Sequence, residues 1–305
     1  MSARDTVTFY LHPKLRKQAE QGNHNFIKKV SDVLTDAGLQ IAFDNDDDLA
    51  RLRALARPGR SLFLMDEPVN TRGLTFRKTY IYPFWHIEKQ GRRWTWPVAE
   101  ESFDPALVDP KKAANFYRFW RLRLFDEAPQ HARADGFVYV PLQGQLLRKR
   151  SFQLCSPIDM LKTVLECDAG RQVVATLHPS ETYSPDEQRA LEDLQAENER
   201  LFVRAGGTEQ LLQTCDYIVT QNSSVGFMGY FFGKPLILFA KTDFHHIALK
   251  VSELGVAAAF DQVSQHRPDY AAYLQWFLQQ RAINAGRPEA NKKICTVLRG
   301  HGWPV

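Results

Sequence analysis

Polar and ionisable side chains gather after several apolar, strand-like runs in the second half of the chain. They occupy four segments, Gln143–Arg150, His178–Glu181, Gln221–Gly226 and Lys241–His246. Ligands of parallel α/β sheets bind at the carboxyl ends of the strands, so these segments form the expected ligand site. Their side chains are of the kinds that bind anions and hydroxyl groups or transfer protons.

The segment Gln221–Gly226 follows a predicted strand and opens a predicted helix. Asn222, Ser223 and Ser224 can cap this helix, and its free N–H groups and dipole favour a bound phosphate. Gly226 allows a ligand or a strand to approach closely. Ordinary N-capping without any ligand accounts for the same residues, so both interpretations stay open.

His178 ends another apolar strand, where it can donate to a phosphate or sugar hydroxyl or act as an acid or base. Glu181 lies three residues later and either orients His178 or caps the next helix. The basic run that contains Arg148 and Arg150 follows a strand, so it is an anion contact or a solvated loop. Gln143, just before this run, is expected to line the site.

Three carboxylates are further candidates for a base or nucleophile. Asp66 and Glu67 follow the third strand of the first half, where turn acids would look the same, and Asp243 follows a strand of the second half. His245 and His246 stand beside Asp243. Adjacent side chains on a regular element point apart, so we expect one of these histidines to face the site and the other to pack in the interior. We do not expect the two to bind one metal ion together.

Familiar cofactor motifs are missing from the 305 residues. We find no G-x-x-x-x-G-K-[ST], no G-x-G-x-x-G after the first strand and no G-x-S-x-G. The D-x-D spacing in Asp44–Asp48 is interpreted as a turn and helix cap. We therefore expect no metal and no cofactor, and the net charge of +4 favours anionic ligands such as nucleotides without requiring nucleic acid.

The composition is that of a globular intracellular protein. Apolar residues make up 44% of the chain, and the four cysteines have no C-x-x-C spacing, so we interpret them as structural thiols. The N-terminal stretch lacks the apolar core of a signal peptide, and no apolar run reaches the roughly 18–20 residues of a membrane span. We expect a cytoplasmic protein, with attachment to the inner face of the membrane as an open alternative.

Strands and helices alternate along both halves, which predicts an α/β fold. The first half has a β-α-β-α-β pattern between Val7 and Met65, half of a doubly wound sheet. Parallel strands are predicted in the second half at Phe137–Leu142, Gln172–Leu177, Leu201–Arg204, Tyr217–Gln221 and Pro235–Ala240. We predict two Rossmann-like domains, residues 1–130 and 131–305.

Residues 137–247 resemble the bacterial capsule polysaccharide biosynthesis family, which includes the β-Kdo transferases. The resemblance rests on three segments, VPLQ (Val140–Gln143), ATLHPSE (Ala175–Glu181) and CDYIVTQNSSVGFMGYFFGKPLILFA (Cys215–Ala240). It implies a GT-B-like architecture, in which two Rossmann-like domains face each other across a cleft. It also implies a glycosyltransferase of surface polysaccharide synthesis with a nucleotide-activated donor, typically a CMP-linked sugar acid such as Kdo.

By this resemblance, His178, Ser223 and Ser224 serve the donor and Gln143 lines its site, while the first domain meets the acceptor. Family members carry an acid a few residues after that Gln, whereas Gln143–Phe152 contains none. Another donor, another base or lost activity would each account for the difference.

Two alternatives therefore stay open: another nucleotide-sugar enzyme of the same shape, such as an epimerase or polyol-phosphate transferase, and a non-catalytic glycan-binding relative. The expected partners are a nucleotide sugar and a glycan or lipid-linked acceptor. Four tryptophans of the first half either bind a glycan or membrane or simply pack in the core. They are Trp85, Trp94, Trp96 and Trp120.

Overall fold

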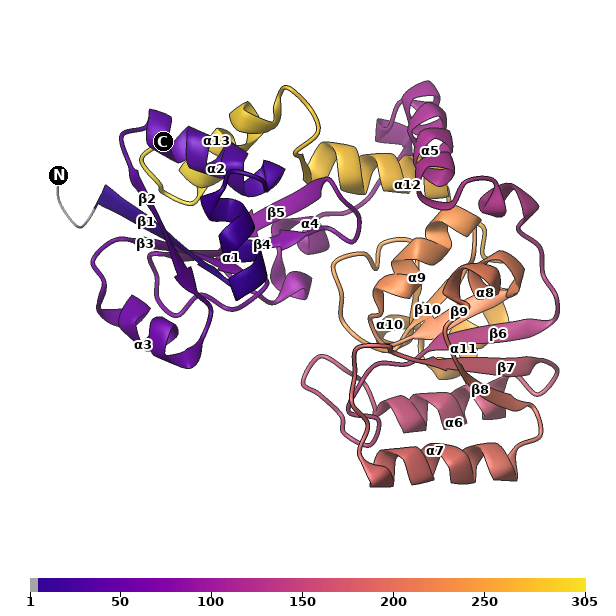
Figure 1. Cartoon of the computed structure of the whole chain (residues 1–305). Helices are drawn as coiled ribbons and strands as arrows, with labels where there is room; N and C mark the ends of the chain where they lie inside the picture. Colours follow the sequence, from indigo (N-terminus) through magenta and orange to yellow (C-terminus); the bar gives the residue numbers. More distant parts are fainter. Residues whose placement is uncertain (1–4) are drawn as a thin grey trace. The chain divides into compact units, whose positions relative to one another are not determined.

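The computed structural model describes residues 5–305 and divides into two compact units (Figure 1). The first unit comprises the chain up to Glu100 together with Trp276–Val305, and the second unit comprises Glu101–Gln275. The boundary therefore lies earlier than the predicted boundary between residues 130 and 131. The end of the chain, which we had placed in the second domain, belongs to the first unit.

A six-stranded sheet in the order β12-β5-β4-β3-β1-β2 forms the centre of the first unit. Strands β1 to β4 are parallel, whereas β5 and β12 are antiparallel to their neighbours. The strands are β1 (Thr6–Leu11), β2 (Gln40–Asn45), β3 (Arg60–Leu64), β4 (Gly73–Lys78), β5 (Phe84–Glu88) and β12 (Ile283–Asn284). The helices are α1 (Pro13–Glu20), α2 (Asn25–Asp36), α3 (Asp48–Ala56), η2 (Arg93–Thr95), α4 (Pro97–Glu100) and α13 (Ala290–Gly300).

The C-terminal segment joins the first unit through apolar packing and strand pairing. Ile283 of β12 pairs with Trp85 of β5, and Ile294 and Leu298 of α13 are fully buried in the core that contains Phe26 of α2. Burying these apolar side chains is the dominant favourable term, and it overrides nearness along the sequence.

A second six-stranded sheet, parallel throughout, has the order β11-β10-β9-β6-β7-β8. Its strands are β6 (Phe137–Pro141), β7 (Gln172–Leu177), β8 (Leu201–Ala205), β9 (Tyr217–Thr220), β10 (Leu236–Leu238) and β11 (Leu249–Lys250). The helices of the second unit are η3 (Pro105–Leu107), α5 (Pro110–Phe125), η4 (Ala128–His131), α6 (Pro157–Cys167), α7 (Pro185–Glu197), α8 (Thr208–Thr214), α9 (Ser224–Gly229), η5 (Tyr230–Phe232), α10 (Val251–Leu254), α11 (Val256–Val263) and α12 (Tyr270–Leu274). Helix α12 continues into the π-helical η6 (Gln275–Arg281).

The strand order of the second sheet reverses between β6 and β9. From β6 the chain adds β7 and β8 on one side, and it adds β9, β10 and β11 on the other. Such a switch point leaves a crevice at the carboxyl ends of the two central strands, because their following loops diverge in opposite directions. The loops after β6 and β9 are the segments that begin at Leu142 and Gln221.

The tryptophans of the first half mostly fill the interior. Trp85, Trp96 and Trp120 are buried, and Trp94 is half-buried. Core packing therefore accounts for three of the four. Among residues 5–305, no helix combines the length and apolar character that a membrane span requires.

Candidate functional site

The loop after β6 folds back across the carboxyl edge of the second sheet and is fixed to the end of β10. Leu154 donates its N–H to the carbonyl of Phe239 (2.9 Å), and Lys241 donates to the carbonyl of Phe152 (2.9 Å). Gln153 forms an antiparallel bridge with Ala240. These backbone contacts hold the basic run at the edge where the sequence predicted a ligand site.

Arg150 belongs to this loop and is only partly exposed. Its guanidinium lies over the ring of Phe152, 4.9 Å from the centroid. The Nε and Nη2 atoms are buried and have no hydrogen-bond partner among the described residues. Burial lowers the pKa of Arg150, and the charge of Glu181 partly opposes that shift. Arg148, in contrast, is exposed to solvent.

Two glutamines that follow the central strands β6 and β9 have buried acceptor atoms. The Oε1 atoms of Gln143 and Gln221 have no hydrogen-bond partner within residues 5–305. The Nε2 atom of Gln221 donates to the carbonyl of Cys155 (3.0 Å), and Nδ2 of Asn222 donates to the carbonyl of Lys241 (3.4 Å). These hydrogen bonds hold the side chains of Gln221 and Asn222 in place. The Oε1 atoms of Gln143 and Gln221 remain available to accept a hydrogen bond from a ligand.

The Ser223 hydroxyl caps α9 by accepting the N–H of Val225 (3.2 Å), which is the ordinary capping that the sequence allowed. Ser224 is exposed at the first turn. A Cβ on Gly226 would come 3.1 Å from Leu236 and 3.2 Å from Thr220, so close packing of α9 on the sheet accounts for this glycine.

His178 is exposed after β7, and its Nδ1 accepts the N–H of Ser180 (3.2 Å). This bond places the proton of the neutral ring on Nε2, which is then a donor. Glu181 is also exposed, and a Cβ built on Gly144 would come 2.1 Å from its Oε2. The carboxylate of Glu181 therefore lies directly against the loop after Gln143.

The segment after β10 is irregular, and it differs from the sequence-based expectation. The rings of His245 and His246 do not point apart: they stack with centroids 4.4 Å apart, because the backbone here follows neither helical nor strand periodicity. Nδ1 of His246 lies 3.0 Å from the hydroxyl of Tyr273. Asp243 is buried, and Thr242 donates its hydroxyl to it (3.2 Å). No group of three or more His, Cys, Asp or Glu within residues 5–305 is placed to hold a metal.

The carboxylates after β3 in the first unit have partners of their own. Asp66 forms an ion pair with Arg51 (2.8 Å) that lacks hydrogen-bond geometry, and Glu67 accepts the N–H of Gly91 (2.7 Å). Burial raises the pKa of Asp66, Arg51 lowers it and Asp46 raises it further. These contacts give both acids a structural role.

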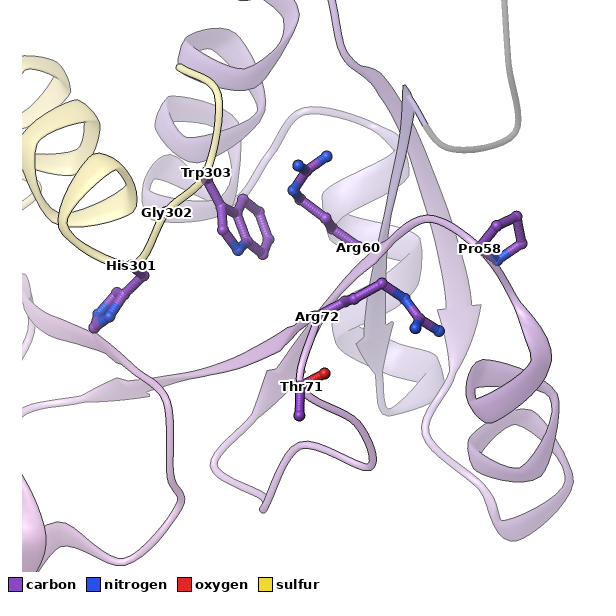
Figure 2. Close-up of a pocket in the computed structure, with 7 residues that line it drawn as sticks. All are labelled: Pro58, Arg60, Thr71, Arg72, His301, Gly302 and Trp303. Carbon is purple, nitrogen blue, oxygen red and sulfur yellow. The ribbon is translucent and has the colours of Figure 1, made fainter.

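A cavity of about 490 Å³ lies at the amino ends of β3 and β4 (Figure 2). Arg60 and Trp303 face each other across it, with the guanidinium 5.9 Å from the ring centroid. Arg72 donates to the carbonyl of Arg57 (2.8 Å). This cavity belongs to the first unit and lies at the end of β3 opposite to Asp66 and Glu67.

The sequence profile described as "capsule polysaccharide biosynthesis protein" matches residues 118–287, more than half of the chain. The chain belongs to this capsule polysaccharide biosynthesis family. The matched region contains every site residue named above in the second unit. No curated protein matches the chain.

Solved structures with similar folds include KpsC of Thermosulfurimonas dismutans, a β-Kdo 2,7 transferase. It has a TM-score of 0.53 and 15% identity, and the match covers 96% of this chain and 99% of that chain. A UDP-GlcNAc 2-epimerase of Neisseria meningitidis has a TM-score of 0.40 and 11% identity, with 97% and 99% covered. The first likeness shows the fold: this member of the capsule polysaccharide biosynthesis family has two Rossmann-like domains of the GT-B type.

One residue of the site had no sequence signal. Gln153 is buried, its Oε1 accepts the N–H of Arg150 (2.7 Å), and its Nε2 is buried without a partner in the described chain. It matches no motif. Only the return of the loop to Ala240 makes it part of the edge.

Proposed function

We propose that this chain is a glycosyltransferase of bacterial surface polysaccharide synthesis, capsular or lipopolysaccharide, that uses a nucleotide-activated sugar. The donor would bind at the carboxyl edge of the second sheet. The observation that carries the proposal is the group of buried polar atoms without partners on Arg150, Gln143 and Gln221. Each such atom costs about 1–3 kcal/mol when unsatisfied, and a ligand that supplies the missing partners removes that cost.

Arg150 is the proposed anion contact. Its planar guanidinium suits the phosphate of a nucleotide or the carboxylate of a sugar acid, since both accept two parallel hydrogen bonds. A CMP-linked sugar acid, Kdo or a relative, has both groups and is the favoured donor. A fixed cation here would stabilise the charge that develops on the departing phosphate without a metal.

His178 is proposed to donate from Nε2 to a phosphate or sugar hydroxyl, because its Nδ1 is already occupied by Ser180. Asn222, Ser223 and Ser224 would line the same edge at the start of α9. Arg148 is exposed, and its proposed role is to attract the anionic donor toward this edge.

Glu181 is the proposed carboxylate of the site. No acid follows Gln143 within its own loop, but the carboxylate of Glu181 reaches this loop from the neighbouring strand and lies against Gly144. Its negative charge also acts on Arg150, whose pKa it raises. Asp66 and Glu67 are weaker candidates, since Arg51 and Gly91 already bind them.

The proposed acceptor is a glycan or a lipid-linked glycan, and no nucleic acid is involved. We place the reaction on the cytoplasmic side of the membrane, because nucleotide-activated sugars are cytoplasmic metabolites. The first unit would bind the acceptor.

Thermal shift with CMP, CDP, UDP, GDP and ADP, each with and without Mg²⁺, tests the donor site. A nucleotide at about 100 times its dissociation constant should stabilise the fold by roughly 2.7 kcal/mol. His178→Ala and Ser223→Ala should abolish the shift. Arg189→Ala, an exposed site on α7, should retain it as the matched control.

Product analysis with the stabilising nucleotide sugar then tests transfer. Formation of a new glycosidic bond supports the proposal, whereas an altered free nucleotide sugar would identify an epimerase. A shift with none of the nucleotides would overturn the transferase and leave a non-catalytic glycan-binding protein, for which the acid-free loop after Gln143 is the supporting observation.

A further inference from the structure

Helix α5 has an unusual charge for its length. Its sixteen residues carry five cationic side chains and no acid, more positive charge than the net +4 of the whole chain. Lys111, Lys112 and Arg118 are exposed. None of the five cations is part of an ion pair within the described residues.

Two large apolar side chains are exposed among these cations. Phe119 is 55% exposed and Leu122 is 54% exposed, and Leu107 in the preceding η3 is 82% exposed. Residues three or four apart lie on the same side of a helix. Leu122 is therefore next to Arg118, and Phe119 is next to Arg123. Lys112 lies on the same side as Phe119, two turns earlier. We define the α5 face as Lys111, Lys112, Arg118, Phe119, Leu122 and Arg123.

The opposite side of α5 is firmly anchored. Trp120 and Ala113 are buried, and Tyr117 donates its hydroxyl to the carbonyl of Tyr230 (2.9 Å). The helix also lies beside α12 (Figure 1). The exposure of Phe119 and Leu122 is therefore a property of a fixed helix.

Helix α3 shows that exposed apolar side chains alone do not identify the surface. Leu49 and Leu52 are 62% and 64% exposed, at least as much as Phe119 and Leu122. Unlike α5, however, α3 begins at two acids, Asp47 and Asp48, and its own cations Arg51 and Arg53 are already in ion pairs. An anionic surface would therefore find no unpaired cations on α3, whereas the α5 face offers several.

We propose that the α5 face binds the surface of an anionic phospholipid bilayer. Phe119 and Leu122 would enter the boundary between headgroups and acyl chains, while the long cationic side chains reach the lipid phosphates. Each cation near an anionic surface contributes on the order of 1 kcal/mol, which explains why several unpaired cations gather on one helix. The exposed cations of this face match the charge of an anionic lipid surface, which is the occupant that we propose.

The test is sedimentation of the full chain with vesicles of phosphatidylcholine alone or with about 30% phosphatidylglycerol, without nucleotide. We expect binding that requires phosphatidylglycerol and falls steeply with salt. Phe119→Ser/Leu122→Ser should weaken it about tenfold or more, and Lys111→Gln/Lys112→Gln/Arg118→Gln should do the same. Leu49→Ser/Leu52→Ser on α3 should bind as the unmodified chain does.

Three outcomes would overturn the proposal: no binding to phosphatidylglycerol vesicles, equal loss in the α3 variant, or binding that both α5 variants retain. Light scattering tests whether a second copy of the chain binds this face instead. If Phe119→Ser/Leu122→Ser converts a dimer to a monomer without changing lipid binding, the face is a self-association surface and the proposal is wrong. The proposal is independent of the donor site. Both α5 variants should keep the nucleotide-induced thermal shift, so failure of one proposal leaves the other standing.

Discussion

The carboxyl edges of the two sheets have similar charged side chains, but these side chains differ in whether they have partners within the protein. In the first unit, Arg51 contacts Asp46 (2.7 Å) and Asp66 (2.8 Å), and Arg57 contacts Asp44 (3.0 Å). In the second unit, Nε and Nη2 of Arg150 have no partner among the described residues. At the first edge, each of these cations lies within ion-pair distance of an acid, although Nη2 of Arg51 makes no hydrogen bond. Arg150 at the second edge has no such acid in the described chain.

This difference separates stability from function. An ion pair that the protein completes holds the fold together, whereas a buried group without a partner costs stability unless a ligand completes it. Proteins retain such groups at sites of function. The contrast therefore supports the proposal that ligands bind at the second edge, although the sequence had candidate acids at both.

Replacing Arg150 should have the largest effect, and mainly on binding. Arg150→Ala removes a charge-assisted contact, so the nucleotide should bind roughly 100-fold more weakly, equivalent to about 2–3 kcal/mol. The free protein should lose at most about 1 kcal/mol, for the contact of the guanidinium with the Phe152 ring, because no described protein group loses a hydrogen bond to Nε or Nη2. Calorimetric titration and urea unfolding measure the two quantities. A larger loss of stability in the free protein would break the comparison.

The amino edge of the second sheet should behave like a satisfied edge. Asp168 accepts the hydroxyl of Tyr217 (2.6 Å) and Nη1 of Arg171 (2.9 Å), and these bonds outweigh burial and lower its pKa. Asp168→Asn should lower the free energy of unfolding by about 2 kcal/mol at pH 7 without changing nucleotide binding.

The pH dependence of this loss follows from the direction of the shift. A carboxyl whose pKa is lower in the folded state stabilises the fold above its unfolded pKa of about 3.9, and this contribution disappears as pH falls through the folded pKa. The difference between Asp168→Asn and the unmodified chain in urea unfolding should therefore shrink from pH 7 toward pH 3. A constant difference would show that the charge of Asp168 is not what stabilises.

Arg51→Ala should have a smaller effect, limited to stability. Losing this cation leaves Asp46 and Asp66 without it, at a cost of about 1 kcal/mol that salt reduces. Nucleotide binding should be unchanged. Arg53→Ala is the matched control, since Arg53 is more exposed and lies 3.6 Å from Asp44, and it should cost less than about 0.5 kcal/mol. Weaker nucleotide binding in Arg51→Ala would move ligand chemistry to the first edge.

Much of the fold was predictable because its elements have local signals. Strand β7 (Gln172–Leu177) has the predicted bounds, and β6 ends one residue before the predicted end at Leu142. Helix α1 has a weaker local signal, because only Leu15 and Ala19 among its eight residues are buried. Strand β12 has two residues and pairs with a strand almost 200 positions earlier, which no local pattern reveals.

The candidate site was predictable in position but not in chemical state. Residues after strands meet at one edge of a parallel sheet, so Arg150 and Gln221 could be placed together from the sequence. Which charges are already neutralised depends on packing between elements: Arg51, which binds Asp66, comes from α3 and has no motif. The α/β pattern thus predicts two candidate edges, and the contacts distinguish them by which charged groups already have partners.

Two glycines make the finest test of the same contrast. A Cβ on Gly144 would meet only the end of the Glu181 side chain, at 2.1 Å from Oε2, whereas a Cβ on Gly91 would come 2.9 Å from the backbone nitrogen of Glu67. A side chain can move aside and backbone cannot, so Gly144→Ala should cost less than about 1 kcal/mol of stability and Gly91→Ala more.

Combining Gly144→Ala with Glu181→Ala identifies the cause of the smaller loss. If displacement of Glu181 is the only cost, the glycine substitution should become nearly neutral once this carboxylate is gone, with a coupling energy of about 0.5–1 kcal/mol in a double-mutant cycle of urea unfolding. Additive effects would mean that the carboxylate does not occupy the space beside Gly144. Glu181 would then lose its place at the ligand edge, and the acid of the proposed transferase would have to come from a residue that already has a protein partner.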